Sequence, residues 1–291
     1  MASSGGKPID MDTLYGLIGW WPSSPSEHGA QERLQRLRVT ISTLLEKLGV
    51  LEALTVRENV HVLDVMAGGC VTGAAAASVL AERGTRVRLL CVDARSMVEE
   101  APGWLSLLPE AARGRVEIGF RRGDATQLPQ LLSKGELWDL ALVWGSPLPH
   151  LSPYRLLLLL AGLRELQPRH GVVLVEQNNI GPKMLVHKYF KEVLVEGKAL
   201  FIYKHWDAVN GMAVRLVYEL PELKYLGVDR IRPWDVADVA AQVAVFYKNV
   251  SMHPVTDYTR VWVVAGIEPR SSAPSWRDLR GTIEKLEQGS V

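Results

Sequence analysis

The chain has 291 residues, of which 47% are hydrophobic and 22% are charged, a globular balance that excludes extensive disorder. Its formal net charge of +1 gives no general attraction to nucleic acid or to an anionic membrane, and the longest apolar stretch, residues 156–163, is too short to span one. Cys70 and Cys91 fall in or beside expected buried strands, and no signal peptide precedes them, which favours a reducing compartment. We therefore expect a soluble, cytoplasmic protein.

The N-terminal part is expected to be helical. Residues 1–11 are rich in serine and glycine and predict a weakly ordered lead-in. Apolar and aromatic residues follow over 14–21, and apolar positions at helical spacing then run through 32–54, with a break at Gly49. We interpret residues 1–57 as a helical cap that precedes the first strand.

From residue 58 onward, apolar strands alternate with helical segments. Near-continuous apolar strands separated by helices are typical of a parallel sheet that is covered on both faces. The expected strands are 61–65, 87–92, 116–121, 140–144 and 172–176, and the expected helices are 73–83, 96–108, 128–132 and 154–166. Residues 58–178 therefore form the core of the predicted domain.

The alternation changes after residue 178. Two apolar strands, 198–204 and 212–220, flank a polar turn that contains Asn210-Gly211, which predicts a β-hairpin within an insertion over residues 179–228. Residues 229–291 are expected to close the core. They carry a helix over 233–247, two adjacent strands at 250–253 and 260–267, and a short polar tail from Pro269.

The segment 61–77 carries the clearest chemical signal. Its strand ends at Asp64, and the small-residue turn Ala67-Gly68-Gly69 leads into an alanine-rich helix. This order brings backbone N–H groups and a helix N-terminus up to a ligand. Because the turn lacks the Gly-x-Gly-x-x-Gly pattern of a pyrophosphate site, it favours a ligand that has an amino group and no phosphate.

Acidic or small residues also follow the next three strands. Asp93-Ala94 end the second strand, where a carboxylate can accept both hydroxyls of a ribose. Asp124-Ala125 follow the third strand, where a side-chain oxygen and a backbone N–H can recognise adenine. Trp144-Gly145 end the fourth strand, at the mouth where a transferred group would meet its acceptor.

In these four signals, residues 58–178 resemble the class I S-adenosylmethionine-dependent methyltransferases, and residues 229–269 are similar to the closing helix and strand pair of that family. The resemblance implies a Rossmann-like α/β fold: a seven-stranded, mostly parallel sheet with an antiparallel last strand, helices on both faces, the N-terminal cap and the hairpin insertion. It implies S-adenosylmethionine as the cofactor, its methionine part held by the turn from Asp64 to Gly69, its ribose by Asp93 and its adenine by Asp124-Ala125. Of the three glycines in the family pattern Asp-x-Gly-x-Gly-x-Gly, Gly68 is present, while Met66 and Cys70 replace the other two.

The loop after the fourth strand bears on the acceptor. Ser146-Pro147-Leu148-Pro149-His150 partly matches the loop of amino-group methyltransferases, without its Pro-Pro pair and aromatic residue. His150 is a candidate catalytic base near neutral pH, and the alternative is a proline-stiffened structural loop. Trp20-Trp21 either cover the cofactor or pack the cap onto the core. No cysteine or histidine spacing predicts a metal site.

We expect methyl transfer to a small molecule enclosed between the cap and the insertion. One alternative is methylation of RNA or protein, for which a local basic face keeps nucleic acid open as a partner. A second is a non-catalytic binding module that keeps the fold, and Met66 and Cys70 are the reason to consider it. An NAD-dependent oxidoreductase is a weaker third, because the glycine pattern is missing. The sequence leaves the oligomeric state open.

Overall fold

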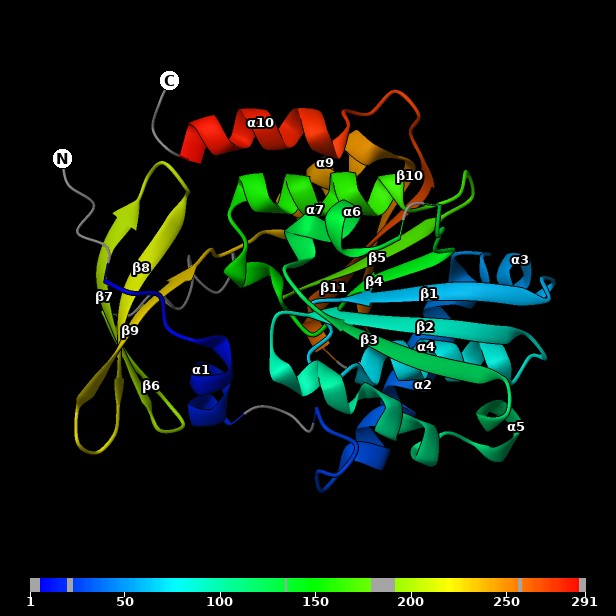
Figure 1. The fold of residues 1–291 in the computed structure, drawn as a ribbon, viewed down its shortest axis with the longest axis horizontal. Helices are drawn as coiled ribbons and strands as arrows, with labels where there is room; N and C mark the ends of the chain where they lie inside the picture. Colours follow the sequence, from blue (N-terminus) through cyan, green and yellow to red (C-terminus); the bar gives the residue numbers. More distant parts are fainter. Residues whose placement is uncertain (1–5, 20–22, 134, 179–191, 256–257, 288–291) are drawn as a thin grey trace.

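The computed structural model describes residues 6–19, 23–133, 135–178, 192–255 and 258–287. Within them, a seven-stranded sheet has helices on both sides, and a four-stranded antiparallel sheet lies beside it (Figure 1). Trp20-Trp21 and the start of the predicted insertion, residues 179–191, lie outside the described residues. None of the helices in the described part of the chain combines the length and apolar character needed to cross a bilayer.

The large sheet has the strand order β10-β11-β5-β4-β1-β2-β3. β1 to β5 are parallel, and β11 runs antiparallel to both of its neighbours, which confirms the predicted sheet. The strands are β1 (Asn59–Val65), β2 (Arg86–Asp93), β3 (Val116–Arg122), β4 (Leu140–Val143), β5 (Val172–Asn178), β10 (Tyr247–Val255) and β11 (Tyr258–Pro269).

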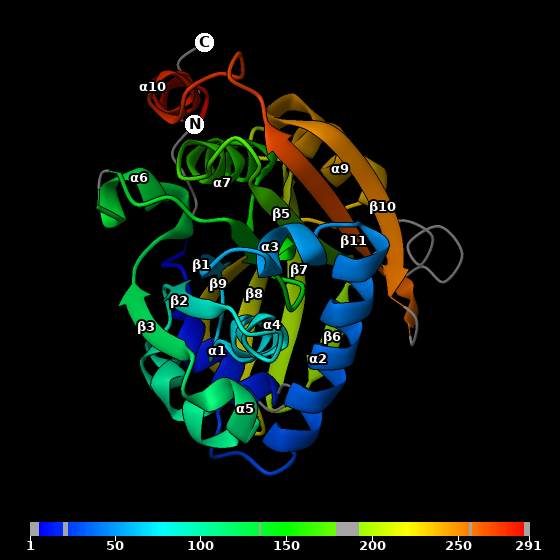
Figure 2. The same ribbon diagram turned by 90° about the vertical axis from the view of Figure 1, so that its right-hand side faces the viewer.

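One face of this sheet is covered by α4 (Val71–Ala81), with α2 (Ala30–Lys47) packed outside it, as Figure 2 shows. Every residue of α4 is buried. Its glycine and alanines let the helix lie close to the strands: a Cβ on Gly73 would come within 2.9 Å of the Asp64 carboxylate. The small residues of this helix therefore follow from close packing between the sheet and α2.

The other face is covered by α7 (Pro153–Glu165) and α9 (Val236–Phe246). α10 (Trp276–Glu287) packs on α7, so the prediction of a short polar tail was wrong. Its stripe of buried residues is narrow, Trp276 and Ile283, which explains why its helical periodicity was overlooked. The short helical segments are α3 (Leu51–Thr55), η1 (Ser96–Leu107), α5 (Glu110–Arg113), η2 (Ala125–Gln127), α6 (Leu128–Leu131) and η3 (Leu148–His150).

The second sheet has the order β6-β7-β8-β9, with all its pairs antiparallel. Its strands are β6 (Val193–Glu196), β7 (Ala199–Asp207), β8 (Met212–Glu219) and β9 (Lys224–Ile231). The predicted hairpin is confirmed as β7 and β8, whereas β6 and β9 were not predicted. β6 has four residues, and a bulge between Val217 and Tyr218 shifts the register of β9, so neither strand carries a clear alternating pattern.

The N-terminal helix α1 (Met11–Ile18) belongs with the second sheet. Leu14 packs against Phe201 and Val217, apart from the two cores of the large sheet. The amide of Ile9 donates to the carbonyl of Val228 at 3.0 Å, and the amide of Val228 donates to the carbonyl of Lys7 at 3.0 Å. Two segments that lie more than 200 residues apart in the chain thus build one layer beside the carboxyl ends of β1 to β4 (Figure 1).

Candidate functional site

A cavity of about 280 Å³ lies where the carboxyl ends of β1, β2, β3 and β4 meet α1. The parallel strands of the large sheet all end at this edge, so the residues that follow each strand converge there. Nine predicted site residues line the cavity, namely Ala67, Gly68, Asp93, Ala94, Asp124, Ala125, Trp144, Gly145 and His150. Asp64 and Gly69, which were also predicted, do not line it.

Asp93 ties two walls of the cavity together. Its Oδ2 accepts a hydrogen bond from the amide of Gly68 at 2.7 Å, and its Oδ1 accepts one from the amide of Arg95 at 2.8 Å. The first bond joins the turn after β1 to the end of β2, and the second orders the loop that follows β2. Asp93 is 7% exposed, so this carboxylate forms part of the cavity wall rather than projecting into solvent.

Asp64 and Gly69 lie behind the turn. The Oδ2 atom of Asp64 accepts a hydrogen bond from the amide of Gly73 at 2.7 Å, at the start of α4, while its Oδ1 has no partner among the described residues. A Cβ on Gly69 would lie 1.8 Å from the carbonyl oxygen of Ser23. Glycine at position 69 is therefore explained by the close approach of the segment before α2, and Asp64 by its bond to α4.

Burial raises the pKa of Asp64 to about 7, with the charge of Asp93 adding to the rise and the Gly73 amide opposing it. A folded-state pKa above the ordinary value means that the folded protein loses stability as pH rises toward 7 and through it. Between pH 4 and pH 8, the free energy of unfolding of the parent should fall by roughly 2–4 kcal/mol more than that of Asp64→Asn, whose side chain cannot ionise. Chemical unfolding across this range checks it, and parallel curves would contradict it.

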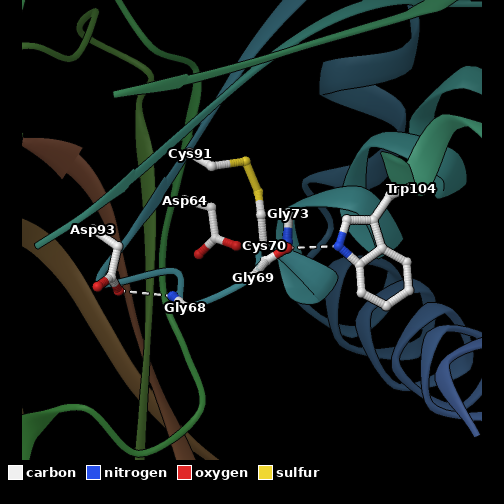
Figure 3. The surroundings of a disulfide bond; sticks show 8 residues. All are labelled: Asp64, Gly68, Gly69, Cys70, Gly73, Cys91, Asp93 and Trp104. Atoms are coloured by element: carbon white, nitrogen blue, oxygen red, sulfur yellow. Dashed lines mark hydrogen bonds between the residues drawn. A yellow bond between two sulfur atoms is a disulfide. The ribbon is translucent and has the colours of Figure 1, made fainter. Parts of the chain in front are cut away.

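Cys70 and Cys91 form a disulfide that joins the end of the turn to β2 (Figure 3). Nothing in the sequence indicated that the two residues pair, so the disulfide is a correction, while the reducing compartment stays a prediction. Cys91 lies beside Asp64 in the pairing of β1 with β2, and the turn after β1 brings Cys70 back toward this strand. The pair is therefore created by sheet register and by the path of the turn.

Trp104 holds the turn from the other side. Its indole Nε1 donates to the carbonyl of Gly69 at 2.6 Å, and the side chain is fully buried (Figure 3). We expect Trp104→Phe to cost about 1–3 kcal/mol beyond the loss of packing, because the buried carbonyl is left without its donor. The free energy of unfolding in urea measures this cost.

Trp138 supplies a matched control for Trp104→Phe. It is also 0% exposed, but its Nε1 has no hydrogen-bond partner among the residues that the structure describes. Trp138→Phe removes the same ring volume without breaking a hydrogen bond, so we expect a smaller loss of stability. Equal losses for the two variants would show that the bond to Gly69 contributes nothing measurable.

The end of β4 is held by a residue that the sequence analysis missed. Glu176, near the end of β5, accepts hydrogen bonds from the amides of Gly145 and Ser146. Burial raises the pKa of Glu176, an effect that these two amides and the charge of Arg33 oppose. The carboxylate fixes the first residues of the loop that carries His150.

Comparison with solved structures identifies this arrangement. The chain superimposes on the PH0226 protein from Pyrococcus horikoshii OT3 with a TM-score of 0.55, at 13% identity, over 90% of this chain and 100% of that one. It superimposes on an S-adenosylmethionine-dependent methyltransferase from Clostridium acetobutylicum ATCC 824 with a TM-score of 0.53, at 10% identity, over 80% of this chain and 91% of that one. For the CcbJ methyltransferase from Streptomyces caelestis, the TM-score is 0.54 at 15% identity, over 89% of this chain and 96% of that one. The chain has the S-adenosylmethionine-dependent methyltransferase fold. No protein-family model matches the chain, and no curated protein matches its sequence.

In this methyltransferase fold, His150 lines the cavity and contacts α1. Its Nε2 shares a hydrogen bond of 2.7 Å with the hydroxyl of Tyr15. Burial lowers the pKa of His150 below its usual value and raises the pKa of Tyr15 to about 12. At neutral pH the imidazole is therefore uncharged and the phenol keeps its proton.

The α1 side of the cavity was not predicted. The guanidinium carbon of Arg95 lies 4.3 Å from the centroid of the Tyr15 ring, over its face. Both residues line the cavity. Asp12 accepts hydrogen bonds from the amide and hydroxyl of Ser96 at 3.0 and 2.8 Å, and its carboxylate lies 3.5 Å from Arg95. Asp12 and Arg95 carry opposite charges, but nothing in the sequence indicates that α1 lies next to the loop after β2.

Proposed function

We propose that the protein transfers a methyl group from S-adenosylmethionine to a small-molecule acceptor, as the sequence analysis expects. The observation that carries this proposal is the position of Asp93. Its carboxylate forms the cavity wall between the ends of β1 and β2 in a chain with the methyltransferase fold, and it holds the turn that would carry the cofactor.

The cavity residues fit this cofactor chemically. Each carboxylate oxygen of Asp93 accepts one backbone hydrogen bond and can accept a second, which leaves two positions for the ribose hydroxyls. Asp124-Ala125 line the part of the cavity that we assign to adenine, although the Oδ1 atom of Asp124 already accepts bonds from Thr126. Ala67-Gly68 line the part assigned to the methionine portion, and Trp144-Gly145 line the part where the transferred group would meet its acceptor.

The conformation of the turn argues against loss of the cofactor. A non-catalytic module was considered because Met66 and Cys70 replace glycines. Both residues take positive φ angles, 57° and 70°, in the region that glycine adopts readily. The turn thus keeps a glycine-like path with other side chains, which supports a functional binding site.

The layer beside the cavity favours a small acceptor over RNA or protein. α1 contributes Met11 and Tyr15 to the cavity lining, and Asp12 fastens this helix to the loop after β2. The cavity volume of about 280 Å³ lies just below the range of about 300–1,000 Å³ that is common for small-molecule sites.

S-adenosylmethionine, when bound, supplies a methyl group that is already activated toward attack. The contribution of the protein is orientation and exclusion of water. We assign to His150 the removal of a proton from the acceptor: its uncharged imidazole accepts the proton at Nε2 once the acceptor replaces the Tyr15 hydroxyl there. Glu176, through the amides of Gly145 and Ser146, holds the loop in place for this step.

Calorimetric titration with S-adenosylhomocysteine tests the cofactor assignment, because this product binds without reacting. We expect one-to-one binding in the micromolar range. Absence of binding at millimolar concentration would overturn the proposal, and tighter binding of NAD in the same assay would favour the oxidoreductase alternative. Salt-sensitive retention on heparin would favour an RNA acceptor.

A further inference from the structure

The turn after β1 requires a left-handed backbone at three positions. The φ angles are 57° at Met66, 55° at Gly68 and 70° at Cys70. Cys70 is also the N-cap of α4, with ψ of 24° and no side-chain cap bond. A residue with a Cβ disfavours this conformation, whereas glycine adopts it freely, so the two non-glycine residues need contacts that hold them there.

Hydrogen bonds anchor the middle of the turn to its surroundings. The amide of Ala67 donates to the carbonyl of Val92 at 3.2 Å, the amide of Gly68 donates to Asp93, and the carbonyl of Gly69 accepts from Trp104. The amide of Cys70 donates within the turn, to the carbonyl of Ala67 at 2.8 Å. The disulfide then ties the Cys70 side chain to Cys91, two residues before Asp93 (Figure 3).

We propose that the Cys70–Cys91 disulfide is a positioning device that holds residue 70 in the left-handed conformation and so keeps the cofactor turn competent to bind. It replaces the conformational freedom of the glycine that the family pattern has at this position. That the ligand of this turn is S-adenosylmethionine rests on the proposed function. It predicts that the affinity for the cofactor depends on the oxidation state of the pair.

Reduction is a two-electron step. The S–S bond breaks, two thiols form with two electrons and two protons from a dithiol, and that dithiol closes to its own disulfide. Both cysteines are 0% exposed, so a dithiol reaches them when the turn opens. A ligand that binds the ordered turn must therefore slow the reduction, since the coupling between two events is reciprocal.

Two double variants separate the crosslink from the conformation of residue 70. Both C70A/C91A and C70G/C91A lack the disulfide and have alanine at position 91, and they differ only in alanine or glycine at position 70. We expect C70A/C91A to bind S-adenosylhomocysteine about 5- to 30-fold more weakly than the oxidised parent, from the ordinary penalty for a left-handed residue. We expect C70G/C91A to bind within about threefold of the parent, because glycine carries no such penalty.

Thermal unfolding of the two variants shows whether the effect is local. The midpoint should fall in both, because both lose the crosslink. The two midpoints should lie close together, because alanine strains residue 70 in the folded state while glycine adds entropy to the unfolded chain. An unchanged affinity in C70A/C91A would overturn the proposal. Equal weakening in both variants would also overturn it, because the disulfide would then act through general stability and not through residue 70.

Reduction of the parent protein provides a test that needs no substitution. With dithiothreitol as the reductant, saturating S-adenosylhomocysteine should slow the appearance of free thiols several-fold, and equal rates would contradict the inference. If the oxidised parent does not bind S-adenosylhomocysteine, the proposed function fails. Amide exchange over residues 67–73 still tests the ordering of the turn: it should be faster in C70A/C91A than in C70G/C91A, and equal rates would overturn that role.

Discussion

Asp93→Ala is expected to weaken binding of S-adenosylhomocysteine by at least about 100-fold, which calorimetric titration measures directly. The substitution removes the acceptor of two backbone bonds, from Gly68 and Arg95, and the carboxylate proposed to hold the ribose. Hydrogen bonds to a charged group contribute about 1.5–3 kcal/mol each, so the loss of two such contacts with the ligand is enough for this effect. An affinity within threefold of the parent would show that the ribose assignment is wrong.

Asp139→Ala is the matched control for Asp93→Ala. Asp139 also accepts a backbone bond, from the amide of His61 at 2.9 Å, and it pairs with Arg57. It lies at the amino ends of the parallel strands, next to the start of β1 and just before β4, and it does not line the cavity. We expect Asp139→Ala to lower the free energy of unfolding without changing the affinity, which separates a local effect of Asp93 from general destabilisation.

The sheet side of the cavity could be predicted from the sequence because the carboxyl ends of parallel strands lie side by side, whatever their separation in the chain. β1, β4 and β5 are mostly buried apolar runs, and β2 and β3 begin with alternating buried and exposed positions. In all five strands the residues at the carboxyl end reach the same side of the sheet. Asp93 and Asp124, which this reasoning selects, both line the cavity, and their roles toward the cofactor stay predictions. The geometry is set by the fold class, so local patterns were sufficient.

The opposite side depends on packing between segments that no local pattern joins. Tyr15 reaches the cavity because α1 packs on the second sheet, where Leu14 contacts Phe201 and Val217. The backbone bonds of Ile9 with Val228 complete this layer. Such long-range pairing is invisible in periodicity, and the same reason explains why the Cys70–Cys91 disulfide was missed.

Gly69 illustrates a different limit. Its place within Ala67-Gly68-Gly69 predicted contact with a ligand, but the structure explains this glycine by the approach of Ser23. A small residue in a turn permits close contact with any neighbour, either a ligand or another part of the chain. The sequence alone does not say which of the two is present.

His150→Gln is expected to lower kcat by about 10²- to 10⁴-fold, the usual contribution of a positioned general base. Glutamine keeps a polar group in the wall of the cavity but cannot accept the proton. The rate of S-adenosylhomocysteine release measures the effect, using the first acceptor found in a screen of small hydroxylated and amine-bearing compounds. A kcat within threefold of the parent would return His150 to the structural alternative.

The pH profile distinguishes a base from a residue that only shapes the loop. Because burial lowers the pKa of His150 below 6.5, the imidazole stays uncharged as pH falls from 8 to about 6.5, and the parent rate should stay level there. The rate should drop at lower pH, when the imidazole takes up a proton, and this limb should be absent in His150→Gln. His253→Gln is the matched control, because His253 on β10 also has a pKa lowered by burial but does not line the cavity. A proton-accepting role requires that the limb disappear with His150 and remain with His253→Gln.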